Sequence, residues 1–431
     1  MRVAFYTLGC KVNTYETESL SELFLANNFT RVSHKEIADV YVINTCSVTN
    51  SGDSKSRKAI RKLIKLNPEA VIAVMGCYSQ LSADELYSID GVYIVVVTIV
   101  REQLLEHVNR VLRDRQKISN VQDVSRYRVF DEVNVTNFTE STRAFLKIQD
   151  GCNNFCSYCI IPFARGPVRS RPKESIIEEA KSLVENGYQE IVLTGIHTGG
   201  YGTDLKQYSF YDLLLELSTL KGLNRIRISS IEINELTDDI IDLLAHNNVF
   251  ARHLHIPLQS GSETILKQMR RKYTKQEFKD RIDFIRHKIP NIAITTDIIT
   301  GFPGETDDMF EEMVEFTKII NFSEMHVFPY SMRSGTTAAK MKDQINGVIK
   351  SIRVNRLLSV SEEMANQYIS KSSPDIASVL FETSDSEYTY GHSDTYIRVK
   401  TKKDESLHNT IQECIITHPK YRNTIVELKK G

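Results

Sequence analysis

Three closely spaced cysteines constrain this chain more than any other feature of its sequence. Cys152, Cys156 and Cys159 have the spacing C-x3-C-x2-C and follow the apolar run 144–148, which we expect to form a strand. Cysteine thiolates favour iron–sulfur clusters or zinc, but a closed zinc site needs a fourth Cys or His, and none follows at a suitable spacing. Three ligands on a four-iron four-sulfur cluster leave one iron open, which is a catalytic arrangement. A zinc knuckle or buried free cysteines are the alternatives.

The length and composition of the chain limit its organisation. We expect two or three domains, because the chain has 431 residues and a 41% apolar fraction. The formal net charge of -1 does not by itself indicate a nucleic-acid partner, so any such contact must come from local patches. The odd number of cysteines and the lack of a signal peptide indicate a reducing compartment. The longest apolar run, 92–100, is too short to span a bilayer. We therefore expect a soluble, cytoplasmic protein with no membrane partner.

The first part of the chain alternates short apolar runs with segments of helical length. The runs read as strands are 3–6, 40–43, 71–74 and 93–97, and the helices between and after them are 15–27, 54–65, 82–87 and 101–113. Continuous apolar strands that alternate with helices indicate a parallel sheet covered on both faces. We predict an open doubly wound α/β domain over residues 1–135.

Each of the other upstream cysteines comes just past the end of one of these strands. Cys10, Cys46 and Cys77 are far apart in the sequence, but ligands gather beyond the carboxyl ends of parallel strands, which lie only about 4.8 Å apart. Gly9 and Gly76 would let the backbone approach closely. The pattern predicts a second site with three thiolates, and inert buried cysteines are the alternative.

The alternation resumes after Cys159 and gives way to a different pattern near the end. Six strands are expected at 145–148, 191–194, 225–228, 253–256, 292–295 and 325–328, which suits a partial barrel over residues 140–370 with a trailing helix at 343–371. Strand-like runs at 378–382, 395–399, 410–413 and 424–428 predict a small closed sheet over 372–431, an architecture that often binds RNA. Two cationic groups are candidates for RNA contact: Lys58, Arg61, Lys62 and Lys65 on one helix face, and Lys400, Lys402 and Lys403.

These motifs resemble a known family. The C-x3-C-x2-C spacing resembles the signature of the radical S-adenosylmethionine (SAM) superfamily, in which the open iron chelates SAM. With the upstream segments GCKVNTYE (9–16), INTCSVT (43–49) and GCYSQ (76–80), the chain resembles the radical SAM methylthiotransferases. The segment 391–399 resembles the TRAM domain that ends these enzymes. Lys11-Val12-Asn13 is similar to the branch that acts on threonylcarbamoyl-adenosine in tRNA, whereas the isopentenyl-adenosine branch usually has Gln-Met-Asn and the ribosomal-protein branch Pro-Lys-Asn.

The resemblance implies two four-iron four-sulfur clusters, one held by each cysteine triplet, together with SAM. It places Gly195 near the SAM amine, Gln259 and Asp297 along the SAM cleft, Arg271 at the SAM carboxylate, and Tyr158 and Phe328 beside the adenine. Asn13, Arg165 and Arg169 are candidates for substrate contact, since a guanidinium suits phosphate or carboxylate; structural ion pairing is the alternative for the two arginines.

The function that follows is a tRNA methylthiotransferase that places a methylthio group on carbon 2 of threonylcarbamoyl-adenosine beside the anticodon. An electron donor such as flavodoxin or ferredoxin would reduce the barrel cluster, the resulting radical would abstract the hydrogen, and the auxiliary cluster would hold or supply the sulfur. The same chemistry on isopentenyl-adenosine or on a ribosomal-protein aspartate is an alternative. A noncatalytic RNA-binding protein with two structural metal sites is a more distant one. The sequence identifies neither the sulfur donor nor the oligomeric state.

Overall fold

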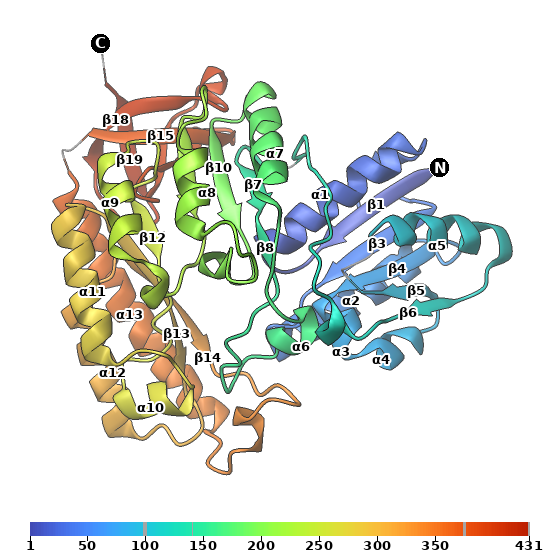
Figure 1. The fold of residues 1–431 in the computed structure, drawn as a ribbon, viewed down its shortest axis with the longest axis horizontal. Helices are drawn as coiled ribbons and strands as arrows, with labels where there is room; N and C mark the ends of the chain where they lie inside the picture. Colours follow the sequence, from blue (N-terminus) through green and yellow to red (C-terminus); the bar gives the residue numbers. More distant parts are fainter. Residues whose placement is uncertain (98–100, 140, 374–375, 430–431) are drawn as a thin grey trace.

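The computed structural model describes residues 1–97, 101–139, 141–373 and 376–429. The fold is α/β: an open sheet, a partial barrel and a small closed β-barrel follow one another along the chain (Figure 1). This is the predicted fold class, and five of the six barrel strands have both ends within one residue of their predicted positions, whereas β13 runs five residues beyond its predicted end, to Thr300.

The N-terminal region is a six-stranded parallel sheet in the order β2-β1-β3-β4-β5-β6. Its central strands, β3 and β4, are buried along their whole length because helices cover both faces. The strands are β1 (Arg2–Thr7), β2 (Thr30–Val32), β3 (Val40–Thr45), β4 (Val71–Gly76), β5 (Val92–Val96) and β6 (Ile118–Asn120). The helices are α1 (Lys11–Ala26), α2 (Asn50–Leu66), α3 (Cys77–Leu81), α4 (Ala83–Tyr87) and α5 (Arg101–Asp114).

The central region is a barrel of six parallel strands that is open on one side. Two three-stranded sheets, β11-β10-β7 and β12-β13-β14, meet where Ile231 N donates to His255 O at 3.0 Å. The strands are β7 (Ala144–Lys147), β10 (Glu190–Thr194), β11 (Arg225–Ile228), β12 (His253–His255), β13 (Ala293–Thr300) and β14 (Glu324–Pro329). The helices are α6 (Ile161–Arg165), α7 (Lys173–Glu185), α8 (Phe210–Leu217), α9 (Asp238–His246), α10 (Glu263–Gln268), α11 (Lys275–Lys288), α12 (Asp307–Ile320) and α13 (Gly347–Lys371).

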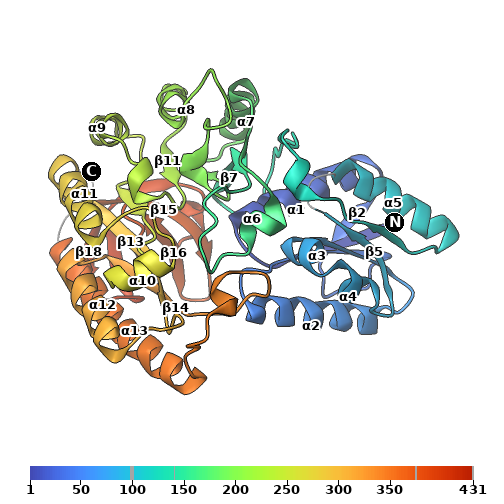
Figure 2. The same cartoon turned by 60° about the horizontal axis from the view of Figure 1, so that its bottom comes forward.

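The N-terminal region closes the open side of the barrel, between β7 and β14. On the β7 side, Lys147 Nζ lies 2.9 Å from Glu16 of α1. On the β14 side, the backbone N–H of Asn50 donates to Ser331 at 3.0 Å, and Arg333 pairs with Asp53 at 2.6 Å. Figure 2 shows the loop after β14 beside α2. The N-terminal sheet and the barrel, both built from parallel strands, therefore face each other at the open side of the barrel.

The C-terminal strands form a closed barrel in the order β15-β16-β17-β19-β18, as the predicted small closed sheet requires. They are β15 (Ile376–Ser384), β16 (Tyr388–Ser393), β17 (Arg398–Lys402), β18 (Ile411–His418) and β19 (Thr424–Leu428). Cys414 is fully buried in β18. None of the described helices is long and apolar enough to cross a membrane.

Several details differ from the sequence expectation. Helices α1 and α2 each begin four residues earlier than predicted, at Lys11 and Asn50. The edge strands β2 and β6 and the strand β16 were not predicted, because three-residue edge strands and a strand of sequence Tyr-Thr-Tyr-Gly-His-Ser carry no apolar run. The strand expected at 395–399 begins only at Arg398, since Tyr396 has a φ of +67° and closes a turn by donating its N–H to Ser393 O. The trailing helix begins at Gly347, four residues later than expected, with Asn346 as its cap.

Candidate active site

Cys10, Cys46 and Cys77 come together at the carboxyl edge of the N-terminal sheet, as their strand-end positions predict. Cys10 caps α1, Cys46 follows β3, and Cys77 begins α3 directly after β4. The three thiols are near enough to act on one another's ionisation. Gly76 has a φ of +105°, and a Cβ at this position would lie 2.3 Å from the carbonyl oxygen of Thr45. Only glycine lets β4 turn here into the Cys77 helix.

Asn13 ties the first two cysteine loops together. Its side-chain amide donates to the carbonyls of Leu8 at 2.8 Å and Thr45 at 3.1 Å, the residues that precede Gly9-Cys10 and Cys46. Its Oδ1 lies 3.6 Å from the thiol of Cys10. Asn13 is 1% exposed, so its place is structural support of the site. The sequence suggested Asn13 as a substrate contact and did not reveal this clamp.

Burial raises the pKa of two of these thiols. It raises the pKa of Cys77 to about 12, although the guanidinium of Arg165, 3.2 Å from the sulfur, opposes the rise. Burial also raises the pKa of Cys46. A metal binds thiolate, so it must displace protons from these groups, and binding becomes tighter as the pH rises.

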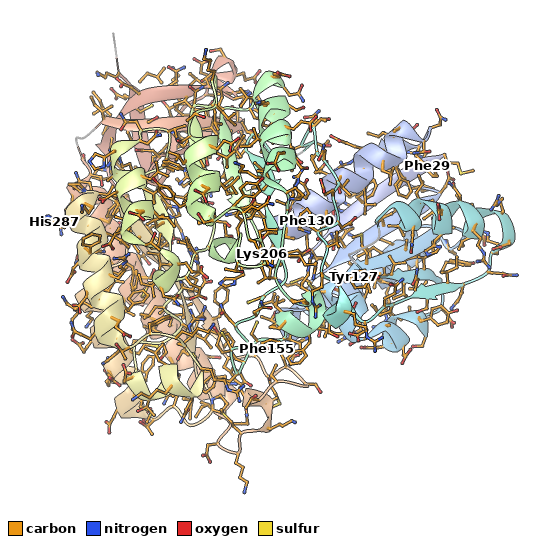
Figure 3. The ribbon with its side chains drawn as sticks, in the orientation of Figure 1. Phe29, Tyr127, Phe130, Phe155, Lys206 and His287 are labelled. Atoms are coloured by element: carbon orange, nitrogen blue, oxygen red, sulfur yellow. The ribbon has the colours of Figure 1, made fainter. Side chains whose placement is uncertain are left out.

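The second triplet lies on the loop that leaves the barrel after β8 (Gln149–Asp150). Local bonds and distant partners both hold the loop. Cys159 N donates to Cys156 O at 3.0 Å, Asn154 N donates to the sulfur of Cys152 at 3.4 Å, and Ser157 N donates to Met269 O at 3.1 Å. Burial raises the pKa of Cys159 to about 12, and the two other cysteines of the triplet raise it further. Phe155, labelled in Figure 3, is 49% exposed in the middle of the loop.

The sulfurs of each triplet can be compared with the geometry of a single metal ion. In the described part of the chain, neither triplet has all three of its sulfurs within 4.8 Å of one another. Tetrahedral zinc with bonds of about 2.3 Å would need sulfurs about 3.8 Å apart. Neither triplet is therefore among the described groups whose ligand atoms lie close enough together for one metal ion.

A cavity of about 250 Å³ lies beside Cys159 at the barrel mouth. Four of the six predicted SAM contacts line it: Tyr158, Gln259, Asp297 and Phe328. Gln259 has a φ of +66°, which is rare for a residue with a side chain and is typical of functional sites. Its strained backbone is held by hydrogen bonds of 2.8 Å to Asp297 O and from Ile299 N. Phe328 is 44% exposed and offers an open aromatic face.

The other two predicted contacts lie apart from this cavity. Gly195 follows β10, and a Cβ there would lie 2.9 Å from Gln149 Oε1. Arg271 lines a neighbouring cavity of about 280 Å³, pairs with Glu232 and lies 3.5 Å from the sulfur of Cys156. Asp297 also lies 3.4 Å from His255, and these two with His326 form the one described group that could hold a single metal ion.

A buried ionic network joins the two cysteine sites. Arg165 is fully buried and contacts Glu16, Asp150 and Asn13 as well as Cys77. Arg169 is 2% exposed and donates to the carbonyls of Arg165 and Pro167 at 2.8 and 3.0 Å. These contacts are those of structural ion pairing, the alternative that the sequence left open. Glu16 was noted only as the end of the GCKVNTYE segment and Lys147 was not singled out, because partners 131 residues apart leave no local signal of their pairing.

Comparisons with known proteins agree with this geometry. The family model described as Radical SAM superfamily matches residues 146–317, and the one described as Uncharacterized protein family UPF0004 matches residues 2–98. A solved radical S-adenosylmethionine methyltransferase, TsrM, from Kitasatospora setae is similar in fold, with a TM-score of 0.56 at 15% identity over 76% of this chain and 72% of that one. The fold and the cysteine loop thus define a radical SAM protein, a class that uses SAM and a four-iron four-sulfur cluster.

Curated relatives cover nearly the whole chain. The Threonylcarbamoyladenosine tRNA methylthiotransferase MtaB of Bacillus subtilis is 49% identical over 94% of this chain and 91% of its own length. The protein of that name in Aquifex aeolicus is 40% identical over 86% and 90%. The tRNA-2-methylthio-N(6)-dimethylallyladenosine synthase of Carboxydothermus hydrogenoformans is 34% identical over 87% of each. The chain therefore belongs to the radical SAM methylthiotransferase family.

Proposed function

We propose that this protein is a tRNA methylthiotransferase that replaces the hydrogen on carbon 2 of N6-threonylcarbamoyl-adenosine, beside the anticodon, with a methylthio group. The proposal rests on the contact between the N-terminal region and the barrel. There, two cysteine triplets lie on facing parts of the chain and are joined by Arg165, and the 250 Å³ cavity lies beside one of them. Relatives that carry this name match at 49% and 40% identity.

Each cysteine triplet would hold one four-iron four-sulfur cluster. Cys152, Cys156 and Cys159 would hold a cluster that, once reduced by a donor such as flavodoxin or ferredoxin, would supply an electron to SAM, and Cys10, Cys46 and Cys77 would hold one that would supply or hold sulfur. The chain's own part is positional. Asn13 and Arg165 fix the first triplet, the strained Gln259 shapes the SAM cavity, and Phe328 and Tyr158 offer aromatic faces for the adenine.

Exposed lysines and arginines suit the approach of a tRNA. Lys58, Arg61, Lys62 and Lys65 are exposed on α2, and none of them pairs with a carboxylate in the described part of the chain. Lys400 lies over the ring of Tyr388 at 4.0 Å, which gives β16 and β17 a cationic and aromatic face. We propose that residues 1–135 form the auxiliary-cluster domain, 140–370 the radical SAM domain and 372–431 the TRAM-like RNA-binding domain of a cytoplasmic enzyme.

Mass spectrometry of tRNA nucleosides from cells with and without the gene tests the function. We expect the loss of methylthio-threonylcarbamoyl-adenosine alone. If the isopentenyl analogue disappears instead, the chemistry holds and the substrate is wrong. If neither changes, methylthiolation of a ribosomal-protein aspartate or a noncatalytic role takes its place; iron and acid-labile sulfide then separate these two, because structural zinc sites contain neither.

A further inference from the structure

Three side chains inside the barrel form a compact set of metal-binding groups that contains no cysteine. His255, Asp297 and His326 each offer one ligand atom, and these atoms all lie within 4.8 Å of one another. In the described chain, the sulfurs of neither cysteine triplet meet this distance. Two imidazoles and one carboxylate are ligands that suit divalent first-row metal ions such as zinc and iron(II).

The strands of the barrel bring these three residues together. β12, β13 and β14 are neighbouring parallel strands. In their register, His255 lies opposite Thr295, and Asp297 lies opposite His326. Asp297 is two residues beyond Thr295, so both side chains project from the same face of β13. Ligands on hydrogen-bonded strands are held more precisely than ligands on loops, so the sheet itself positions this set.

The ring of His255 is oriented for metal binding. Its Nδ1 lies 2.9 Å from the hydroxyl of Thr295, and its Nε2 lies 3.4 Å from Asp297. The same hydroxyl lies 2.9 Å from Nε2 of His253. A hydroxyl has two lone pairs and can accept an N–H from each ring, which leaves Nε2 of His255 free to bind a metal. Two ligands on tetrahedral zinc, with bonds of about 2.0–2.1 Å, are about 3.4 Å apart, which is the separation of His255 Nε2 and Asp297 here.

Two cavities give access to these ligands. Asp297 lines the cavity of about 250 Å³ at the barrel mouth. His326 is exposed and, with Thr295, lines a second cavity of about 410 Å³ that extends to Tyr396 of the C-terminal barrel. The rings of His326 and His255 stack with their centroids 5.7 Å apart, and the exposed ring can turn towards an ion. Three protein ligands leave a further position for a water or for an oxygen atom of a bound substrate.

We propose that His255, Asp297 and His326 form a binding site for one divalent metal ion of the zinc class, with an open coordination position. The site goes beyond the proposed function and does not depend on it, because none of its ligands belongs to a cysteine triplet. Zinc binds such a ligand set more tightly than iron(II) does. Added zinc should therefore replace any iron(II) that enters the site during cluster reconstitution.

Zinc binding to the full-length, cluster-reconstituted protein tests the inference. We expect dialysis against zinc to add one zinc per chain without loss of iron or sulfide. X-ray absorption at the zinc edge should show nitrogen and oxygen ligands at about 2.0–2.2 Å and no sulfur at about 2.3 Å. His326→Ala should abolish this zinc, and Thr295→Val should weaken its binding by about ten- to a hundredfold. His287→Ala, at an exposed position on α11 (Figure 3), should not change it.

Three outcomes would overturn the inference: the unaltered protein takes up no zinc, the bound zinc has sulfur ligands, or His326→Ala retains zinc with unchanged ligands. Sulfur ligands would mean that zinc occupies a cysteine triplet. Equal losses in His326→Ala and His287→Ala would also overturn it, because surface histidines would then bind the ion. Circular dichroism shows whether each variant still folds. A protein that binds zinc as expected but forms no methylthio-nucleoside keeps the metal site and refutes the proposed function.

Discussion

The two cysteine triplets offer the same ligands but are built in opposite ways. Cys10, Cys46 and Cys77 come from three separate strand ends, so only the folded sheet brings them together. Cys152, Cys156 and Cys159 share one loop, so the sequence itself keeps them close together, and contacts with distant residues, such as Ser157 N donating to Met269 O, hold the loop in place. The first triplet is therefore gathered by tertiary structure and the second by its spacing in the chain. Arg165 makes them a pair, because it contacts Cys77 and also Asp150, two residues before Cys152.

The largest expected effect comes from removing each triplet in turn. Changing Cys152, Cys156 and Cys159 to Ala should abolish SAM cleavage, because no other described thiols lie at the cavity that Tyr158 and Gln259 line. Changing Cys10, Cys46 and Cys77 to Ala should leave SAM cleavage and remove only methylthio transfer. Each change should remove about four irons per chain. The measurements are 5′-deoxyadenosine, methylthiolated nucleoside and iron content.

Surviving SAM cleavage after loss of the barrel triplet would refute the division of roles between the two sites. Circular dichroism is the control for that test, because it shows whether each triple variant still folds. The dependence of the first triplet on tertiary structure adds a second expectation. Mild urea should release iron from the N-terminal site before the barrel site, provided that each holds a cluster.

The next effect concerns the arginine that joins the sites. Arg165→Met should lower the free energy of unfolding by about 3–5 kcal/mol, since it leaves the buried carboxylates of Glu16 and Asp150 with too little positive charge. Arg356→Met removes an exposed ion pair with Glu311 and should cost no more than about 1 kcal/mol. Urea unfolding followed by circular dichroism measures both, because the chain has no tryptophan. If the two changes lowered the free energy of unfolding equally, Arg165 would not have the role of joining the two sites.

Acid should destabilise the charged barrel more than the apolar sheet of the N-terminal region. Burial by itself would raise the pKa of Glu190, but Arg227 and Arg225 outweigh it and lower the pKa to about 2. A carboxyl whose pKa is lower in the folded state than its ordinary value of 4.5 stabilises the fold above that value. This stabilisation, about 3 kcal/mol, is lost as the pH falls from about 4.5 towards 2.

Hydrogen exchange along the chain measures that loss region by region. Between pH 5 and 3, protection of β10 and β11 should fall more steeply than protection of β3 and β4, whose residues are all buried and uncharged. Glu190→Gln should be less stable at neutral pH and should show a flatter response to acid, because it has no carboxyl group to protonate. An unchanged acid response in this variant would mean that other groups control the barrel.

The sequence was sufficient to predict those parts of the fold and of the site that leave a local pattern. Continuous apolar runs marked β3, β4 and the barrel strands because both faces of a parallel sheet are covered. Glycine turns and cysteine spacing marked both triplets, and the motifs that carry Gln259 and Asp297 led to a real cavity. The closed C-terminal barrel was also expected, although β16 was missed.

The rest depends on partners that are distant in the sequence. No local pattern shows that Glu16 meets Lys147 and Arg165, because these pairs form only when the N-terminal region packs against the barrel. Nor does any local pattern show that Asn13 reaches the carbonyl of Thr45, because the two residues meet only when the N-terminal sheet folds. The contact between the barrel and the C-terminal strands is a further case, because Arg143 pairs with Glu382 of β15 and Arg227 donates to the carbonyl of Ser393 in β16.

The smallest expected effect concerns the seventh cysteine, and it tests whether the other six are special. Cys414 is fully buried in β18, and burial raises the pKa of its thiol to about 11. Cys414→Ala should lower the free energy of unfolding by only about 1 kcal/mol, because it removes one small buried group. Iron content, SAM cleavage and methylthio transfer should equal those of the unaltered protein. If iron content fell with Cys414→Ala while the fold persisted, ligation would follow the number of cysteines in the chain and not the two architectures that gather them.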